Sequence, residues 1–114
     1  MSSKGFGSKD RSIKKTTKKG NFLEKDKLLS NAFALHSKGR LKEASEIYHF
    51  LIKNRYFDPR VFNNLGTIYL QLKDFDKAKL LFEESIKKFP GSLEPYSNLA
   101  NLLIKKGNSD AAKE

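Results

Sequence analysis

Cysteine and tryptophan are absent from this sequence, and histidine occurs only twice, as His36 and His49. Without cysteine the chain can form neither a disulfide framework nor a thiolate metal site. The two histidines fall on different predicted helices, with no HExxH-type spacing of metal ligands or catalytic groups. We therefore predict no catalytic residue, no metal site and no cofactor.

Long apolar runs are also missing. No stretch approaches the roughly 18 to 20 apolar residues that span a bilayer, and the N-terminus lacks the apolar segment of a secretory signal. The short Gly5-Phe6-Gly7 sequence follows no strand pattern, so it does not indicate a phosphate-binding loop. Together these absences predict a cytoplasmic protein that is not an enzyme.

Positive charge is concentrated near the N-terminus. Residues 1–23 carry seven basic side chains against one acidic, which is +6 of the net charge of +10. Their few large apolar groups cannot offset chain entropy, so we predict that residues 1–22 form a disordered basic tail. Such a tail serves as a solubilising linker or attracts phosphate non-specifically. Having one arginine and few aromatics, it does not indicate specific reading of nucleic acid.

From about residue 23 onward, apolar residues recur three and four positions apart, which predicts helices; strict alternation, the signature of strands, is absent. Asp58-Pro59 is typical of a helix start, with an N-cap followed by proline at the first helical position. Gly39, Phe89-Pro90-Gly91 and Lys106-Gly107-Asn108 interrupt the pattern. The predicted helices are about 24–37, 41–54, 59–72, 75–88, 93–106 and 109–114.

The helical segments repeat along the chain at a constant interval of about 34 residues, which we call the repeat step. Ala44, Ala78 and Ala112 are evenly spaced by this step, and so are Ala32, Gly66 and Ala100. Small residues at a fixed place have a physical reason, because two helices of a hairpin approach closely only where a side chain is small. An ordinary helical bundle needs no such self-similarity.

These residues resemble the tetratricopeptide-repeat family, whose period is about 34 residues and whose pattern is W-x₂-L-G-x₂-Y…A-x₃-F…P. The middle unit matches with phenylalanine in place of tryptophan, through Phe62, Leu65, Gly66, Tyr69, Ala78, Phe82 and Pro90. The sequence resembles bacterial members with short N-terminal arrays, and this resemblance implies an all-α fold. It predicts a right-handed superhelical stack of antiparallel helix pairs over residues 23–114. Repeats would span about 25–58 and 59–92, with an incomplete third at 93–114.

In that family the first helix of each repeat lines a concave groove. In the middle repeat one polar helical face carries Arg60, Asn63, Asn64, Thr67 and Gln71. Stacking would align Ser30, Asn64 and Asn98 away from the packing face, where amides could pair with the main chain of an extended peptide. Alternatively, these asparagines are ordinary surface residues. The predicted peptide-binding residues are Ser30, Phe33, Arg60, Asn63, Asn64, Thr67, Gln71, Asn98 and Asn101.

The resemblance implies a scaffold that binds a protein or an extended peptide. Two alternatives are the N-terminal scaffold of a larger transferase or oxygenase, and nucleic-acid binding through the tail. The incomplete third repeat leaves an open C-terminal face. The incomplete repeat favours the interpretation that the sequence is a fragment of a longer chain. The alternative is that a partner or a second copy covers this face.

Overall fold

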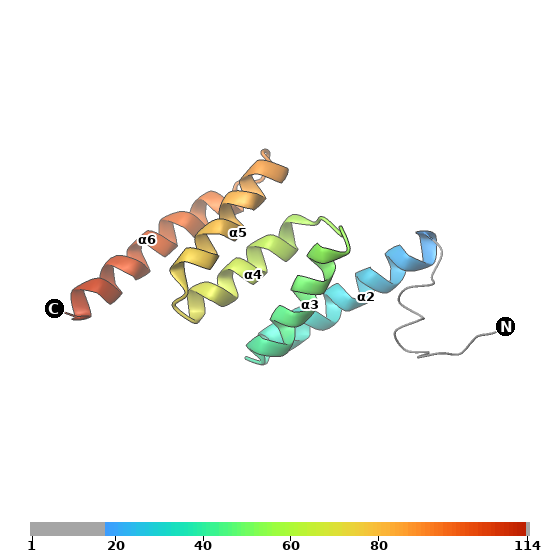
Figure 1. The fold of residues 1–114 in the computed structure, drawn as a ribbon, viewed down its shortest axis with the longest axis horizontal. Helices are drawn as coiled ribbons and strands as arrows, with labels where there is room; N and C mark the ends of the chain where they lie inside the picture. Colours follow the sequence, from blue (N-terminus) through green and yellow to red (C-terminus); the bar gives the residue numbers. More distant parts are fainter. Residues whose placement is uncertain (1–17, 114) are drawn as a thin grey trace.

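The computed structural model describes residues 18–113, and this part of the chain forms five α-helices without any strand. In chain order they are α2 (Lys18–Ser37), α3 (Leu41–Lys53), α4 (Pro59–Gln71), α5 (Phe75–Lys88) and α6 (Glu94–Lys113) (Figure 1). The predicted all-α class is confirmed, whereas the right-handed superhelix stays a prediction.

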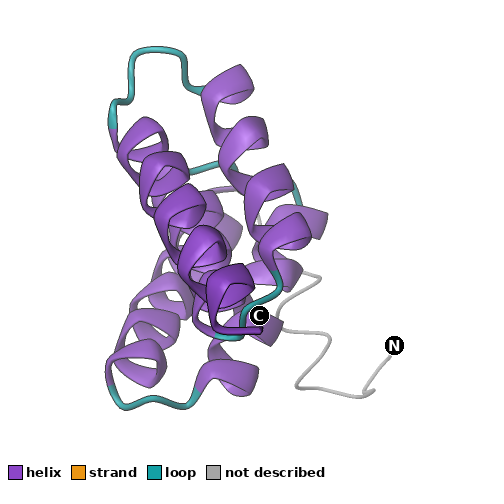
Figure 2. Ribbon diagram, turned by 90° about the vertical axis from the view of Figure 1, so that its left-hand side faces the viewer, coloured by secondary structure: helices purple, strands orange, loops and turns teal. Residues whose placement is uncertain are grey.

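Short loops join the helices into two hairpins, α2–α3 and α4–α5, with α6 packed beside α5 (Figures 1 and 2). The stack measures 64 × 30 × 20 Å. The helix α2 begins at Lys18, ahead of the predicted boundary at residue 23. Extending an existing helix adds one hydrogen bond for each residue fixed, so a helix can grow into polar sequence. Of the predicted disordered tail at residues 1–22, residues 18–22 belong instead to α2, and residues 1–17 lie outside the described residues.

The predicted start of α4 is confirmed in detail. The Asp58 carboxylate accepts a hydrogen bond from the backbone N–H of Arg60 at 2.9 Å, and Pro59 opens the helix. This cap satisfies a backbone donor that has no partner within the helix. At the start of α5, Asp74 accepts from the N–H of Lys77 at 3.3 Å.

The hairpin turns recur with the same repeat step. Gly39 (φ +80°) follows α2, and Lys73 (φ +63°) occupies the equivalent place after α4. A left-handed residue of this kind commonly ends a helix. The next equivalent is Gly107, yet α6 runs through it to Lys113.

The predicted break at 106–108 and the separate helix 109–114 are therefore wrong within the described residues. Residues 109–113 offer only two alanines to bury in a returning helix. Continuing the helix keeps its backbone hydrogen bonds and adds an ion pair between Lys106 Nζ and Asp110 Oδ2 at 3.3 Å.

Two apolar clusters form the core. The first joins α2, α3 and α4 around Leu29, Ala32, Ala44, Tyr48, Leu51, Tyr56, Val61, Leu65 and Ile68. The second joins α4, α5 and α6 around Leu70, Ala78, Phe82 and Leu102. Both clusters include small residues that the repeat predicted at the tight helix contacts. Gly66 is buried as well, which confirms its predicted place in the α4–α5 hairpin.

Candidate peptide-binding groove

Side chains predicted to line the groove link α2 to α4. The guanidinium carbon of Arg60 lies 5.5 Å from the centre of the Phe33 ring. At the other end of α4, Gln71 Oε1 and His36 Nε2 share a hydrogen bond of 3.1 Å. The first helices of neighbouring repeats thus present Phe33, Arg60 and Gln71 on one side of the stack.

The Arg60 side chain is also held locally. Its Nε and Nη2 atoms donate to the two carboxylate oxygens of Asp58, at 3.0 and 2.7 Å. These hydrogen bonds are the main reason why the pKa of Asp58 lies below its ordinary value. A ligand that recruits Arg60 must compete with this bidentate contact.

Two of the predicted groove residues, Asn63 and Thr67, differ in how deeply the structure buries them between α4 and α6. Thr67 is half-buried and its hydroxyl donates to the backbone oxygen of Asn63 at 2.9 Å. Asn63 is only 1% exposed, and its Nδ2 lies 3.4 Å from Glu94 Oε1. Asn63 therefore lies beneath the surface, packed between the repeats.

A cavity of about 410 Å³ opens between the C-terminal ends of α4 and α6 and the start of α5. Apolar groups, amides, hydroxyls and two lysines line it, and none of the lining residues is acidic. The lining residues are Thr67, Leu70, Gln71, Lys73, Phe75, Asn101, Lys105, Asn108, Ser109 and Ala112. Three of the predicted residues, Thr67, Gln71 and Asn101, come together here.

The two lysines of this cavity, Lys73 and Lys105, are not among the residues that the sequence predicted to bind a peptide. Lys105 stands one repeat step after Gln71, so the step applied to Gln71 would have found it. Lys73 carries the left-handed turn after α4, and only the path of α6 places that turn beside Lys105, Asn108 and Ser109.

The row of Ser30, Asn64 and Asn98 is less exposed than the sequence predicted. Ser30 is exposed, but Asn64 is half-buried and its Nδ2 lies 3.4 Å from the Tyr48 hydroxyl in α3. In Asn98 the Nδ2 atom is buried and has no hydrogen-bond partner among residues 18–113. The expectation that both asparagines point away from the packing face is wrong for Asn64, whose amide contacts α3 of the preceding repeat. The amide nitrogen of Asn98 is buried rather than directed to solvent. Whether these residues bind a peptide stays a prediction.

We infer the cause of the unpaired Asn98 amide from the repeat. Tyr48, the partner of Asn64, is replaced one repeat step later by Phe82, which has no hydroxyl. We expect Phe82→Tyr to supply the missing acceptor and to raise the free energy of unfolding by about 0.5–1.5 kcal/mol. Chemical denaturation of Phe82→Tyr, Asn98→Ala and the double variant measures the coupling. Equal effects of Phe82→Tyr with and without Asn98 would contradict this pairing.

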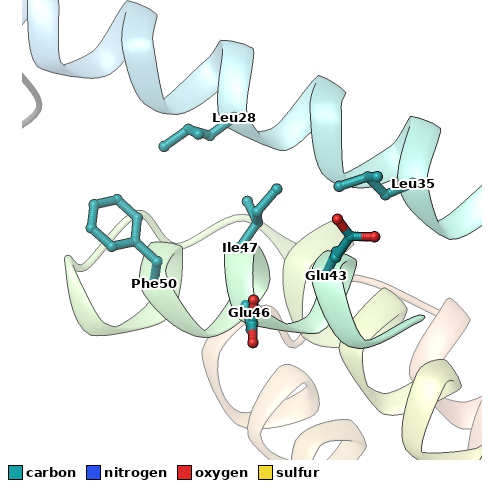
Figure 3. Close-up of a pocket in the computed structure, with 6 residues that line it drawn as sticks. All are labelled: Leu28, Leu35, Glu43, Glu46, Ile47 and Phe50. Atoms are coloured by element: carbon teal, nitrogen blue, oxygen red, sulfur yellow. The ribbon is translucent and has the colours of Figure 1, made fainter. Parts of the chain in front are cut away.

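A second cavity, of about 340 Å³, lies between α2 and α3. Leu28 and Leu35 of α2 face Ile47 and Phe50 of α3, with Glu43 close to Leu35 (Figure 3). One repeat later the equivalents of Leu35 and Ile47 pack against the first core cluster. The cavity is therefore the surface that a preceding helix pair covers in the second repeat.

No group of three or more histidine, aspartate or glutamate side chains in the described residues is arranged to hold a metal ion. Among helices α2 to α6, none combines the length and the hydrophobicity that a membrane span needs.

Comparison with known proteins agrees with the repeat. The tetratricopeptide-repeat family model matches residues 69–114, from the end of α4 through α6. No curated protein matches the chain. The repeat step, the antiparallel hairpins with small residues at their contacts, and this family match show that residues 69–114 carry tetratricopeptide-repeat sequence.

Proposed function

We propose that this chain is a non-enzymatic scaffold of the cytoplasm that binds an extended segment of another protein in the groove between α4 and α6. Tetratricopeptide repeats mediate protein interactions in general. The observation that carries the proposal is the cavity of about 410 Å³, whose lining combines amides and hydroxyls with apolar side chains. Pockets with this combination orient a ligand through a few polar groups and bury its apolar part.

The chemistry of the lining favours one kind of segment. The amides of Gln71, Asn101 and Asn108 can each donate to and accept from a peptide main chain. Leu70 and Phe75 provide an apolar surface for one side chain of the segment. Because two lysines are the only charged residues of the lining, a carboxylate is the preferred counter-charge. The proposed ligand is an extended peptide with an apolar side chain next to an acidic residue or a free C-terminus.

Selection from a random peptide library displayed on phage tests this proposal. We expect the enriched peptides to combine a carboxylate with a neighbouring apolar residue. In a fluorescence-anisotropy titration, Lys73→Ala/Lys105→Ala should weaken their binding by about tenfold or more, since a hydrogen bond to a charged group contributes roughly 1.5–3 kcal/mol. Raising the salt concentration should weaken binding to the wild type more than to this variant.

The matched control removes two lysines that do not line the cavity. Lys79 and Lys87 are exposed on α5, so Lys79→Ala/Lys87→Ala causes the same change in net charge. This control should retain wild-type affinity. Enriched peptides without a carboxylate, or equal loss of affinity in both double variants, would show that the ligand does not occupy this cavity.

A further inference from the structure

One face of α6 is apolar along its length and is covered by no other described helix. Tyr96, Ala100, Leu103, Ile104, Gly107 and Ala111 follow each other at helical spacing, and we call them the α6 stripe. Tyr96 is 50% exposed, Leu103 67% and Ile104 62%, whereas Leu102 on the opposite face is 2% exposed. In Figure 1 α6 is the last helix of the stack.

The repeat indicates what this face is shaped to receive. Tyr96 and Ala100 are the equivalents of Phe62 and Gly66, which are buried in the second repeat. There the antiparallel helix α5 covers the face, with its Phe82 ring directly over Gly66. The same helical positions are therefore covered by an antiparallel helix in the second repeat and exposed in α6.

We propose that the α6 stripe of a second copy of this chain is the antiparallel helix that covers this face. Tyr96 lies at the N-terminal end of the stripe, Leu103 and Ile104 lie at its centre, and the small Gly107 and Ala111 lie in its C-terminal half. Antiparallel pairing places Tyr96 against the small Ala111 of the second copy and lets the helices approach closely where Ala100 meets Gly107. The central Leu103 and Ile104 of the two copies then pack against each other. Parallel pairing would set Tyr96 against Tyr96 and leave a gap at the small residues. A two-fold axis near Leu103 closes the contact as a dimer.

The charge pattern permits this contact in a chain of net charge +10. The stripe has no charged side chain. At one border Lys106 and Asp110 neutralise each other through their 3.3 Å ion pair, and Ser97 and Asn101 at the other border are uncharged. Two copies can therefore meet here without like charges facing each other.

The size of the α6 stripe determines how strong the proposed dimer is expected to be. From Tyr96 to Ala111 it is about 22 Å long at 1.5 Å per residue, and it is one helix wide. Such an area lies below the standard interface of about 1,600 Å². The dimer should accordingly be weak, forming at micromolar concentrations or above.

Sedimentation velocity of the full chain over a concentration series tests dimer formation. We expect the wild type to shift from monomer to dimer, and Leu103→Glu to weaken the association at least tenfold by placing a charge at the centre of the contact. Leu80 on α5 is 62% exposed and lies outside the stripe, so Leu80→Glu is the matched control and should dimerise as the wild type does. A wild type that stays monomeric, or equal effects of both substitutions, would overturn the proposal.

Engineered cysteines test the orientation, since the chain has no native cysteine. Tyr96→Cys mixed with Ala111→Cys should give the mixed disulfide under mild oxidation, because a disulfide needs Cα atoms about 4.4–6.8 Å apart. Self-linking of Tyr96→Cys alone would indicate parallel pairing and overturn the proposal. An intrachain disulfide in Ala100→Cys/Ala112→Cys would do the same, since it would show that the end of α6 folds back onto its own stripe. The groove is lined by other faces of α6, so the Lys73→Ala/Lys105→Ala experiment is independent of these outcomes.

Discussion

Replacing Gly66 with alanine is expected to lower the free energy of unfolding by about 1–3 kcal/mol. A Cβ atom at this position would lie 2.4 Å from Cε1 of Phe82 and 2.9 Å from its Cζ. The Phe82 side chain is fully buried between α4, α5 and α6, so it cannot move away without disturbing the core. Gly66→Leu should destabilise the fold further. Urea denaturation followed by circular dichroism measures the change.

Gly107 provides the control, because it is also a helical glycine but no group of the described residues lies within 4 Å of the place where its Cβ would be. Gly107→Ala should raise stability by roughly 0.5–1 kcal/mol, as alanine is the better helix former. Phe82→Leu in the Gly66→Ala background should recover part of the loss by making room for the methyl group. An unchanged denaturation midpoint for Gly66→Ala would show that the α4–α5 contact is looser than the structure indicates.

The second large effect concerns a polar group in the core. We expect Asn63→Leu to raise the free energy of unfolding by about 1–3 kcal/mol. The Oδ1 atom of Asn63 is buried and has no hydrogen-bond partner in the part of the chain that the structure describes, and Nδ2 makes a long contact of 3.4 Å with Glu94. Leu29, which stands one repeat step earlier, is equally buried at 1% exposure. The first repeat therefore shows that leucine fits this position.

Binding and stability should separate in this variant. Because Asn63 lies beneath the surface, Asn63→Leu should keep the affinity of peptides selected on the wild type. Asn64→Ala makes a useful comparison: it removes the contact with Tyr48 and should cost about 0.5–1.5 kcal/mol of stability. If Asn63→Leu kept its stability but lost peptide binding, the side chain would have to be accessible in solution, and its predicted role in the groove would return. A destabilised Asn63→Leu would show instead that the contact with Glu94 outweighs the cost of the unpaired Oδ1 atom.

The groove and the α6 stripe lie on different faces of the same helix. Asn101 and Lys105 face the cavity, whereas Ala100 and Leu103 belong to the stripe. A dimer formed through the stripe would therefore carry two open grooves. For a partner with two binding segments, the second contact would become intramolecular and the apparent affinity would rise without new contacts.

Much of this protein follows from its sequence alone, because the relevant signals are local or strictly periodic. The repeat step places Ala44 and Ala78 at the hairpin contacts, since only small side chains let two helices approach. Asp58 and Pro59 predict the start of α4, since a cap depends on residues next to each other in the chain. The same periodicity identified the polar face from which Thr67, Gln71 and Asn101 reach one cavity.

Only the tertiary structure decided which polar residues of that face are accessible. Asn63 and Thr67 lie one turn apart on α4, yet α6 buries the first and leaves the second at the cavity. Sequence periodicity gives the direction of a side chain about its own helix, but a neighbouring helix decides whether that direction leads to solvent. Gly107 illustrates the same limit. Its local signal equals that of Gly39, but a turn persists only where the returning helix has apolar surface to bury, and here α6 continues instead.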